Sequence, residues 1–215
     1  MRCLSHAILA CLLAAAGGCA KKPDIRQSMV DDLLRARKTL QPIAPLTTTY
    51  GDFPPEEAYA VQAAVTARLA RGTDRAAGYK IAGASPAARQ AWGLTEPIYG
   101  ALLASMETPE GGSAQPGTFC ALAVEAEIAF VVARDVDRPL ASVAELKPYV
   151  RSVHVALDLA DNRFQGEPKA ADRIADAAGA GRYVLGKPLD PRRVDVDRLV
   201  ATLKHQGKVV YRGQP

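Results

Sequence analysis

The sequence predicts an α+β fold, in which a helical N-terminal third is followed by a β-rich remainder. Apolar residues recur at helical spacing between residues 29 and 40, whereas apolar and polar residues alternate between residues 152 and 159. The 215 residues are 48% hydrophobic and 23% charged, as in an ordinary globular protein, and contain no internal repeat. We therefore expect one domain over residues 29–215.

Helix-start signals support the predicted helices. At Pro54-Pro55-Glu56-Glu57, proline in the first turn and acidic residues at the positive end of the helix dipole begin a helix. Ser85 is placed as an N-cap with Pro86 after it, and Ser142 with Glu145 forms a capping box. We expect helices over residues 29–40, 54–71, 85–92, 97–106, 142–150 and 168–178.

Runs of β-branched and alternating residues predict the strands. The longest covers residues 124–134, and in the next the residues Val153, Val155, Leu157 and Leu159 share one face. We expect strands over residues 78–83, 124–134, 152–159, 182–185, 198–203 and 208–212.

Residues 1–18 have the pattern of a signal peptide. A basic start precedes an apolar stretch whose helix would be about 20 Å long, shorter than the ~30 Å hydrocarbon core of a bilayer. Ala16-Gly17-Gly18 before Cys19 resembles a bacterial lipobox, in which the cysteine is lipidated and becomes the new N-terminus. We therefore expect a lipid on Cys19, a polar tether over residues 19–28, and a lipid-anchored protein of the cell envelope, on its periplasmic face or at an outer membrane. An ordinary signal peptide with an incidental cysteine is the alternative.

Cysteine usage and charge exclude several classes of function. With Cys3 and Cys11 in the signal peptide and Cys19 lipidated, only Cys120 remains, and one cysteine cannot form an intramolecular disulfide. The spacings of a Cys/His zinc site do not occur. The net charge is +4 without a dense run of Lys and Arg, so nucleic acid is not an expected partner.

Carboxylates interrupt two of the predicted strands. Residues two apart on a strand share a face about 6.6 Å apart, so Glu125 and Glu127 point the same way and repel unless a cation holds both. Asp158 adds a third carboxylate on the next strand, and three oxygen donors suit Mg²⁺ or Mn²⁺. Alternatively, these residues line the wet face of an antiparallel sheet.

Lys80 is a second candidate for chemistry. It lies between Tyr79 and Ile81 in a short segment bounded by glycines. A lysine in an apolar niche can act as an acid or base if its pKa falls. An ordinary exposed lysine is the alternative.

Short strings in these segments occur together in a known family. They occupy residues 58–62, 78–81, 85–88, 93–100, 124–131, 134–135, 156–164, 175–178 and 183–186. Two of them contain Val124-Glu125-Ala126-Glu127 and Ala156-Leu157-Asp158-Leu159-Ala160-Asp161. In this order the strings resemble the 2-keto-4-pentenoate hydratases of the fumarylacetoacetate hydrolase superfamily.

The resemblance implies a fumarylacetoacetate hydrolase-like mixed β-sheet roll with an N-terminal helical portion. It also implies a metal-dependent hydratase or related lyase that acts on a small 2-keto (2-hydroxydienoate) acid, in which Mg²⁺ or Mn²⁺ stabilises an enolate. The site residues that it implies are Glu125, Glu127 and Asp158 as metal ligands, Lys80 and Asp161 as catalytic residues, and Tyr79 and Ser85 as substrate-binding residues.

Three departures from the family leave an alternative open. Asp158 stands where the family has Glu, Ala177 and Gly179 stand where it has polar residues, and the sequence ends at Pro215 where the family continues for several strands. The alternative is a catalytically degenerate hydratase-fold lipoprotein that serves as a binding or interaction module. The shortened sheet further predicts an exposed edge over residues 198–212 that a second copy, in a homo-oligomer, or another envelope protein would cover.

Overall fold

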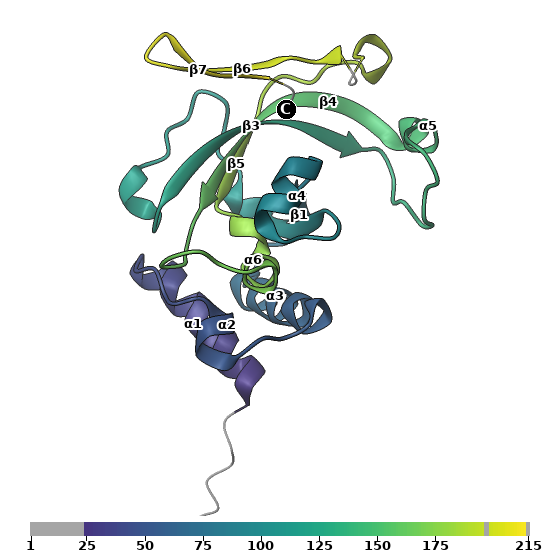
Figure 1. The fold of residues 1–215 in the computed structure, drawn as a ribbon. Helices are drawn as coiled ribbons and strands as arrows, with labels where there is room; N and C mark the ends of the chain where they lie inside the picture. The colour runs from purple at the N-terminus through teal and green to yellow at the C-terminus, as the bar shows by residue number, and fades with distance from the viewer. Residues whose placement is uncertain (1–23, 196–197, 214–215) are drawn as a thin grey trace, which may run out of the picture.

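The computed structural model of the protein describes residues 24–195 and 198–213. Figure 1 shows a layer of helices below a sheet of strands β3, β4 and β5, with a hairpin of β6 and β7 beyond that sheet. The helices are α1 (Ile25–Thr39), α2 (Leu46–Tyr50), α3 (Pro55–Leu69), α4 (Pro86–Trp92), α5 (Val143–Leu146) and α6 (Ala170–Ala175). The strands are β1 (Ala76–Ala82), β2 (Ile98–Leu103), β3 (Leu122–Val132), β4 (Val150–Asp161), β5 (Arg182–Leu185), β6 (Ala201–His205) and β7 (Lys208–Gly213).

The helical layer encloses the hydrophobic core. The core residues come from α1, α2, α3, β2, α6 and the turn before α6, and they are Met29, Val30, Leu33, Leu46, Ala58, Val61, Val65, Ile98, Phe164, Ile174 and Ala175. Burial of one leucine or isoleucine of this kind contributes about 1.5–3 kcal/mol. The fully buried Asp172 is satisfied in this core, because its carboxylate accepts hydrogen bonds from the amide and hydroxyl of Thr47 and from the amide of Lys169. This carboxylate thus joins the starts of α2 and α6.

The strands pair as three small antiparallel sheets within the described residues. These are β1 with β2, β3 with β4 and β5, and β6 with β7. The register of β3 and β4 places Glu125 directly opposite Asp158, and that of β1 and β2 places Lys80 opposite Gly100. Facing residues of an antiparallel pair point to the same side, so the side chains of Glu125 and Asp158 share one face of the sheet.

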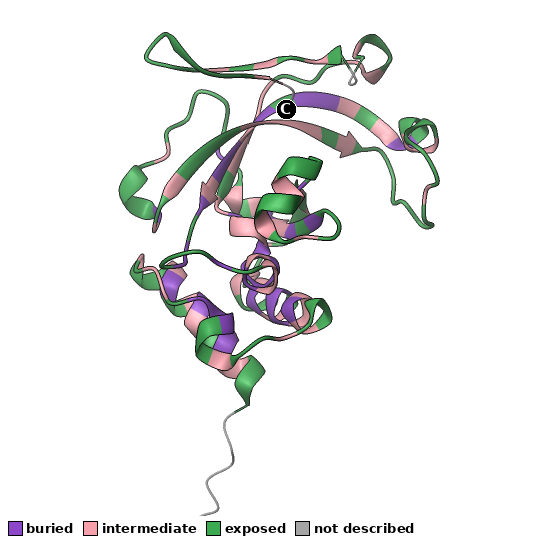
Figure 2. Cartoon of the chain, in the orientation of Figure 1, coloured by how far each residue is buried: buried purple, intermediate pink, exposed green. Residues whose placement is uncertain are grey.

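The carboxylate-bearing face of the β3–β4 sheet is the inner one. On β4, Ala156 and Asp158 are buried, whereas Val155, on the other face, is 66% exposed. Val124 and Phe130 on the outer face of β3 are also exposed, and Figure 2 shows both buried and exposed stretches along β4. The apolar outer face therefore meets solvent at Val155 but is covered at Val153 and Leu159, and the polar face lies toward β1 and the helices.

The predicted α+β class and most of the predicted elements are confirmed. The Ser85 hydroxyl accepts a hydrogen bond from the Ala88 amide at the start of α4, and the Ser142 hydroxyl accepts one from the Glu145 amide at the start of α5. Helix α1 begins at Ile25, before the predicted start of 29, because the Asp24 carboxylate caps it.

The prediction of a helix over residues 97–106 is wrong. This segment forms β2, followed by a 3-10 turn over Ala104–Met106. Gly100 explains the difference. A Cβ at this position would lie 2.0 Å from the carbonyl oxygen of Ala177, so only glycine lets the backbone of β2 approach that carbonyl.

The predicted helix over residues 168–178 is shorter in the structure. After α6 the chain enters a 3-10 turn over Ala177–Gly179, and Ala177 and Ala178 have φ values of 54° and 52°. Such left-handed backbone ends a helix and is costly for alanine.

Two other predictions concern the ends of the chain. The β6–β7 hairpin is present. Val200, just before β6, and Val209 and Val210 of β7 are each more than half exposed, so the expected cover by a second copy or another protein stays a prediction. The signal peptide and the lipidated Cys19 lie outside the described residues. Among the helices of the described ranges, none has the length and apolar character needed to cross a bilayer.

Candidate active site

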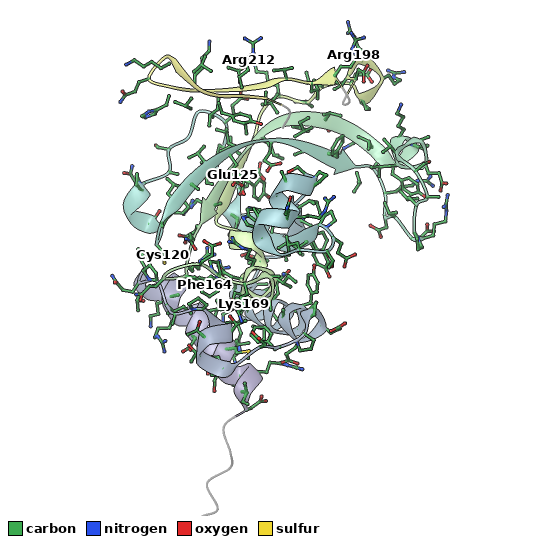
Figure 3. The ribbon with its side chains drawn as sticks, in the orientation of Figure 1. Cys120, Glu125, Phe164, Lys169, Arg198 and Arg212 are labelled. Atoms are coloured by element: carbon green, nitrogen blue, oxygen red, sulfur yellow. The ribbon has the colours of Figure 1, made fainter. Side chains whose placement is uncertain are left out.

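A cavity of about 210 Å³ lies between β1, the inner face of β3–β4 and the α6 segment. Lys80, Glu125 and Asp161 line it, together with the apolar side chains of Trp92 and Ile98. Figure 3 shows Glu125 on the side of the sheet that faces these elements, far from Arg212 of the hairpin. The cavity is smaller than the roughly 300–1,000 Å³ of pockets for drug-sized ligands, and it suits a small metabolite.

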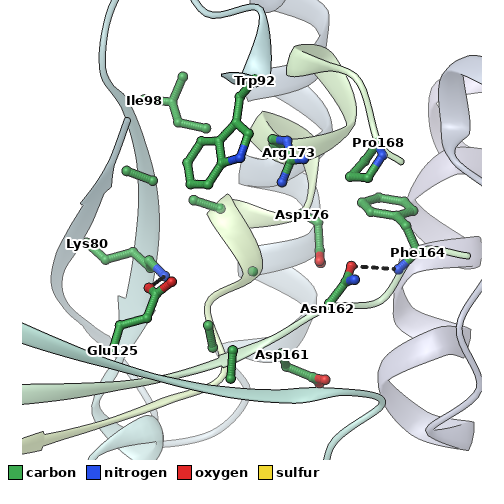
Figure 4. Close-up of a pocket in the computed structure, with 15 residues that line it drawn as sticks. Lys80, Trp92, Ile98, Glu125, Asp161, Asn162, Phe164, Pro168, Arg173 and Asp176 are labelled. Carbon is green, nitrogen blue, oxygen red and sulfur yellow. Dashed lines mark hydrogen bonds and ion pairs between the residues drawn. The ribbon is translucent and has the colours of Figure 1, made fainter. Parts of the chain in front are cut away.

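Lys80 and Glu125, which line one wall of this cavity, converge there with Asp158, which is not a lining residue. The Lys80 ammonium donates a hydrogen bond to the Asp158 carboxylate, and the side chains of this pair are only 10% and 7% exposed. The distance from Lys80 Nζ to Glu125 Oε2 is 3.9 Å. Figure 4 shows the Lys80 and Glu125 side chains end to end at this wall. Strand β1 thus brings the predicted lysine to the predicted carboxylates on β3 and β4.

The carboxylates of this wall carry too much negative charge for one lysine. Burial raises the pKa of Glu127 to about 7, and the nearby charges of Asp158 and Glu125 add to that rise. Burial also raises the pKa of Glu125, although Lys80 opposes the effect. Raised values of this kind indicate carboxylates that are crowded and short of a positive partner.

The carboxylates of Glu125, Glu127 and Asp158 have the chemistry of ligands for a hard divalent ion. All three lie on one sheet face, and oxygen donors of this type suit Mg²⁺ or Mn²⁺. Within residues 24–195 and 198–213, no three His, Cys, Asp or Glu side chains are already arranged around a common point as metal ligands. In this structure the Lys80 ammonium supplies the positive charge at the carboxylates. The role of Glu125, Glu127 and Asp158 as metal ligands stays a prediction.

Asp161 lines the cavity but is held by other groups. Its carboxylate accepts a hydrogen bond from the Ala121 amide at 3.0 Å and pairs with Arg163 at 3.1 Å. Its side chain is only 5% exposed. This arrangement fixes Asp161 as an anchor between β4 and the start of β3, and its predicted catalytic role stays a prediction.

Tyr79 and Ser85, the predicted substrate-binding residues, do not line the cavity. Tyr79 is 66% exposed, and its ring packs edge-on against Tyr99. The Ser85 hydroxyl caps α4 and is exposed. Alternation along β1 explains the position of Tyr79, because the residue next to the inward Lys80 points outward.

A buried network of charges at the cavity was not predicted from the sequence. Arg163 donates to both oxygens of Asp176 at 3.1 Å, and Arg37 of α1 donates to the same carboxylate at 3.0 Å. All three side chains are 12% exposed or less. Burial, together with the neighbouring Arg163, lowers the pKa of Arg37 to about 10.

Trp92 and Arg173 at the cavity were also missed as site residues. The Arg173 guanidinium lies over the Trp92 ring, 4.7 Å from its centroid. Trp92 is the single tryptophan of the chain and ends a predicted helix, which is the one signal that could have drawn attention to it.

Comparisons with known proteins show the family to which the chain belongs. No family model matches the chain. It is 33% identical over 193 residues to the 2-keto-4-pentenoate hydratase of Paraburkholderia xenovorans (strain LB400) and, equally, to 2-keto-4-pentenoate hydratase 3 of Pseudomonas putida. Each match covers 89% of this chain and 72% of the relative.

A solved structure has the same fold. The 4-oxalocrotonate decarboxylase from Pseudomonas putida G7, complexed with magnesium and adipate, superposes with a TM-score of 0.84 at 22% identity, over 88% of this chain and 73% of that one. The fold is therefore fumarylacetoacetate hydrolase-like, as the sequence predicted. By its similarity to the curated relatives, the chain belongs to the 2-keto-4-pentenoate hydratase family.

Proposed function

We propose that this protein is a divalent-metal-dependent hydro-lyase that adds water to a 2-hydroxydienoate, the enol form of an unsaturated 2-keto acid. The observation that carries the proposal is the cluster in which Lys80 and Glu125, at the wall of the cavity, meet Asp158. The names of the curated hydratases support the reaction. The magnesium in the similar decarboxylase structure supports a divalent ion.

The residues at and next to the cavity would divide the work as follows. Glu125, Glu127 and Asp158 would hold Mg²⁺ or Mn²⁺, which when bound supplies positive charge for the enolate that develops at the 2-oxo oxygen. Lys80 is the cavity group suited to move a proton, because its ammonium lies at this wall and is 10% exposed. Trp92 supplies an apolar surface that limits the access of water to the hydrocarbon part of the substrate.

A spectrophotometric assay tests the proposal. The full chain, with Mg²⁺ or Mn²⁺, should remove the ultraviolet absorbance of 2-hydroxypenta-2,4-dienoate as water adds to the conjugated double bond. EDTA should stop the reaction, and Lys80→Met should slow it by about 10²–10⁴-fold, the usual contribution of an acid–base group. Absence of turnover with either ion would refute the proposal and favour the catalytically degenerate alternative, which the comparisons do not support.

Measurement of CO₂ separates the hydratase from a decarboxylase. A decarboxylase would pass through the same enolate after loss of CO₂ from a 2-keto acid. Release of CO₂ without hydration would therefore replace the proposed reaction with a related one at the same site.

We also propose that the protein is anchored in the cell envelope by a lipid on Cys19. The support is the sequence pattern alone: a short apolar stretch, small residues before the cysteine, and Lys21-Lys22 after it. A single acyl chain binds membranes only marginally, so stable anchoring requires more than one chain.

A further inference from the structure

We propose that Ser152 and His154 form a second catalytic site, a serine–histidine pair that hydrolyses a carboxylic ester bearing an anionic group. The pair lies near the start of β4, which Figure 1 shows next to α5. Ser152 helps to line a groove of about 570 Å³ there, and this groove shares no lining residue with the cavity of the candidate active site. The proposed hydration of a dienoate uses neither residue, so the two proposals are independent.

The hydrogen bonds of His154 define the roles of its two ring nitrogens. Nδ1 lies 2.7 Å from the carbonyl oxygen of Gly186, and Nε2 lies 2.9 Å from the hydroxyl oxygen of Ser152. A carbonyl oxygen can only accept, so in the neutral ring Nδ1 carries the proton and donates it. Nε2 is then the acceptor, and the Ser152 hydroxyl donates to it. A serine that donates to a histidine oriented by a third group has the arrangement of an activated nucleophile.

The backbone holds this pair in place. Ser152 and His154 are two residues apart on β4, so their side chains share one strand face. The segment after β5 is fastened to β4, because Val153 and Leu189 exchange two backbone hydrogen bonds of 3.1 and 2.8 Å. The amide of Gly186 also donates to β4, at 2.9 Å. These bonds keep the Gly186 carbonyl at the His154 ring, which is buried, whereas Ser152 is half-buried at the groove.

The groove around Ser152 is positively charged. Three cationic residues and one carboxylate line it, namely Lys147, Arg151, Arg192 and Asp190. Asp190 already pairs with Arg192 at 2.7 Å, so no carboxylate of the groove is left to balance the exposed Lys147 and Arg151. An anionic substrate would be attracted to these two side chains, and their donors would stabilise the negative charge that develops on an ester oxygen.

The pair supports a complete hydrolysis. Ser152 Oγ attacks the carbonyl carbon of the ester while its proton passes to His154 Nε2. The bond between that carbon and the alcohol oxygen then breaks, and the alcohol leaves with the proton from Nε2. A water molecule, deprotonated by the same nitrogen, attacks the acyl-serine, and the proton returns to Ser152. One ester and one water thus give one acid and one alcohol.

Two matched esters test the proposal on the full-length protein in EDTA, which excludes hydrolysis by an ion-bound water. Mono-4-nitrophenyl terephthalate and 4-nitrophenyl 4-methylbenzoate share a leaving group, and only the first is anionic. Relative to the spontaneous rate of each, we expect the protein to hydrolyse the anionic ester about tenfold or more faster than the neutral one. Ser152→Ala should abolish the reaction, and His154→Leu should slow it by about 10²–10⁴-fold. Ser105→Ala, which removes an exposed hydroxyl bound to Asp74 outside the groove, should retain it.

Labelling with a fluorophosphonate gives a second readout, because this reagent phosphonylates activated serines. Mass spectrometry should locate the adduct on Ser152 and not on Ser105. An absence of hydrolysis and of adduct in the wild type would show that the hydrogen bond is only structural. Unchanged hydrolysis in Ser152→Ala, an adduct elsewhere, or equal hydrolysis of the two esters would also overturn the proposal. If His154→Leu does not fold, Ser152→Ala carries the test, since it removes one oxygen atom and keeps the histidine.

Discussion

Replacement of Lys80 by methionine removes the cation that lies between the carboxylates of the cavity. The Lys80 and Asp158 side chains are 10% and 7% exposed, so this is a buried ion pair, whereas Glu125 is half-exposed. Breaking a buried pair by removal of one partner costs about 3–5 kcal/mol, because the other charge stays buried without compensation. This is a large part of the roughly 5–15 kcal/mol that stabilises a typical protein. We expect the urea midpoint of the metal-free variant to fall by about 1–2 M.

Urea unfolding followed by circular dichroism in EDTA measures this change. Lys169→Met is the matched control, because Lys169 pairs with Asp52 on the surface, with side chains 64% and 76% exposed, and such a pair is worth less than about 1 kcal/mol. Mg²⁺ at about 100 times its dissociation constant adds about 2.7 kcal/mol. Lys80→Met should regain more stability from a fixed Mg²⁺ concentration than the wild type gains, since no ammonium competes for its carboxylates. If Lys80→Met and Lys169→Met unfold at the same urea concentration, the argument is refuted.

Three further predictions follow from the same chemistry. Arg163→Met should lower the free energy of unfolding by about 3–5 kcal/mol, because it leaves the buried carboxylates of Asp161 and Asp176 with less positive charge beside them. A much smaller loss in urea unfolding would show that the network is unimportant for stability. The pKa of Glu127 is raised to about 7, so its neutral form is favoured below that pH and protons compete with a metal ion. The Mg²⁺ affinity measured by calorimetry should therefore fall from pH 8 to pH 6. An affinity that does not change with pH would count against Glu127 as a ligand. Cys19→Ala should release the protein from the membrane fraction or block its processing, and unchanged fractionation and processing would exclude lipidation there.

The sequence predicted the carboxylate site through local rules only. A spacing of two residues is enough to place Glu125 and Glu127 on one strand face. Strand pairing places Asp158 directly opposite Glu125. Lys80 reaches both because it packs against Asp158, which lies 78 positions away in the sequence. The strand pattern named Asp158 and Lys80 as candidates, but it favoured the wet face of a sheet, and only the resemblance to the hydratases joined these residues in one site.

Long-range contacts also explain what the sequence did not reveal. The strand at residues 98–103 has an apolar pattern that a helix could share, and the close approach of Gly100 to the Ala177 carbonyl decides between them. Arg37 lies 139 positions from Asp176, so no local pattern could pair them. Arg173 belongs to a predicted helix, but its position over Trp92 becomes visible only when α4 and α6 come together at the cavity.

The most direct test of the central claim is calorimetric titration of Mg²⁺ and Mn²⁺ into the metal-free protein and two carboxylate variants. The wild type should bind one of these ions saturably, and Asp158→Asn and Glu125→Gln should each weaken binding on the order of tenfold or more while the circular dichroism spectrum is retained. Glu145→Gln, which changes a carboxylate paired with Arg138 outside the cavity, should bind as the wild type does. Absence of binding by the wild type at millimolar concentration, or equal affinities in all four proteins, would contradict a metal site at Glu125 and Asp158.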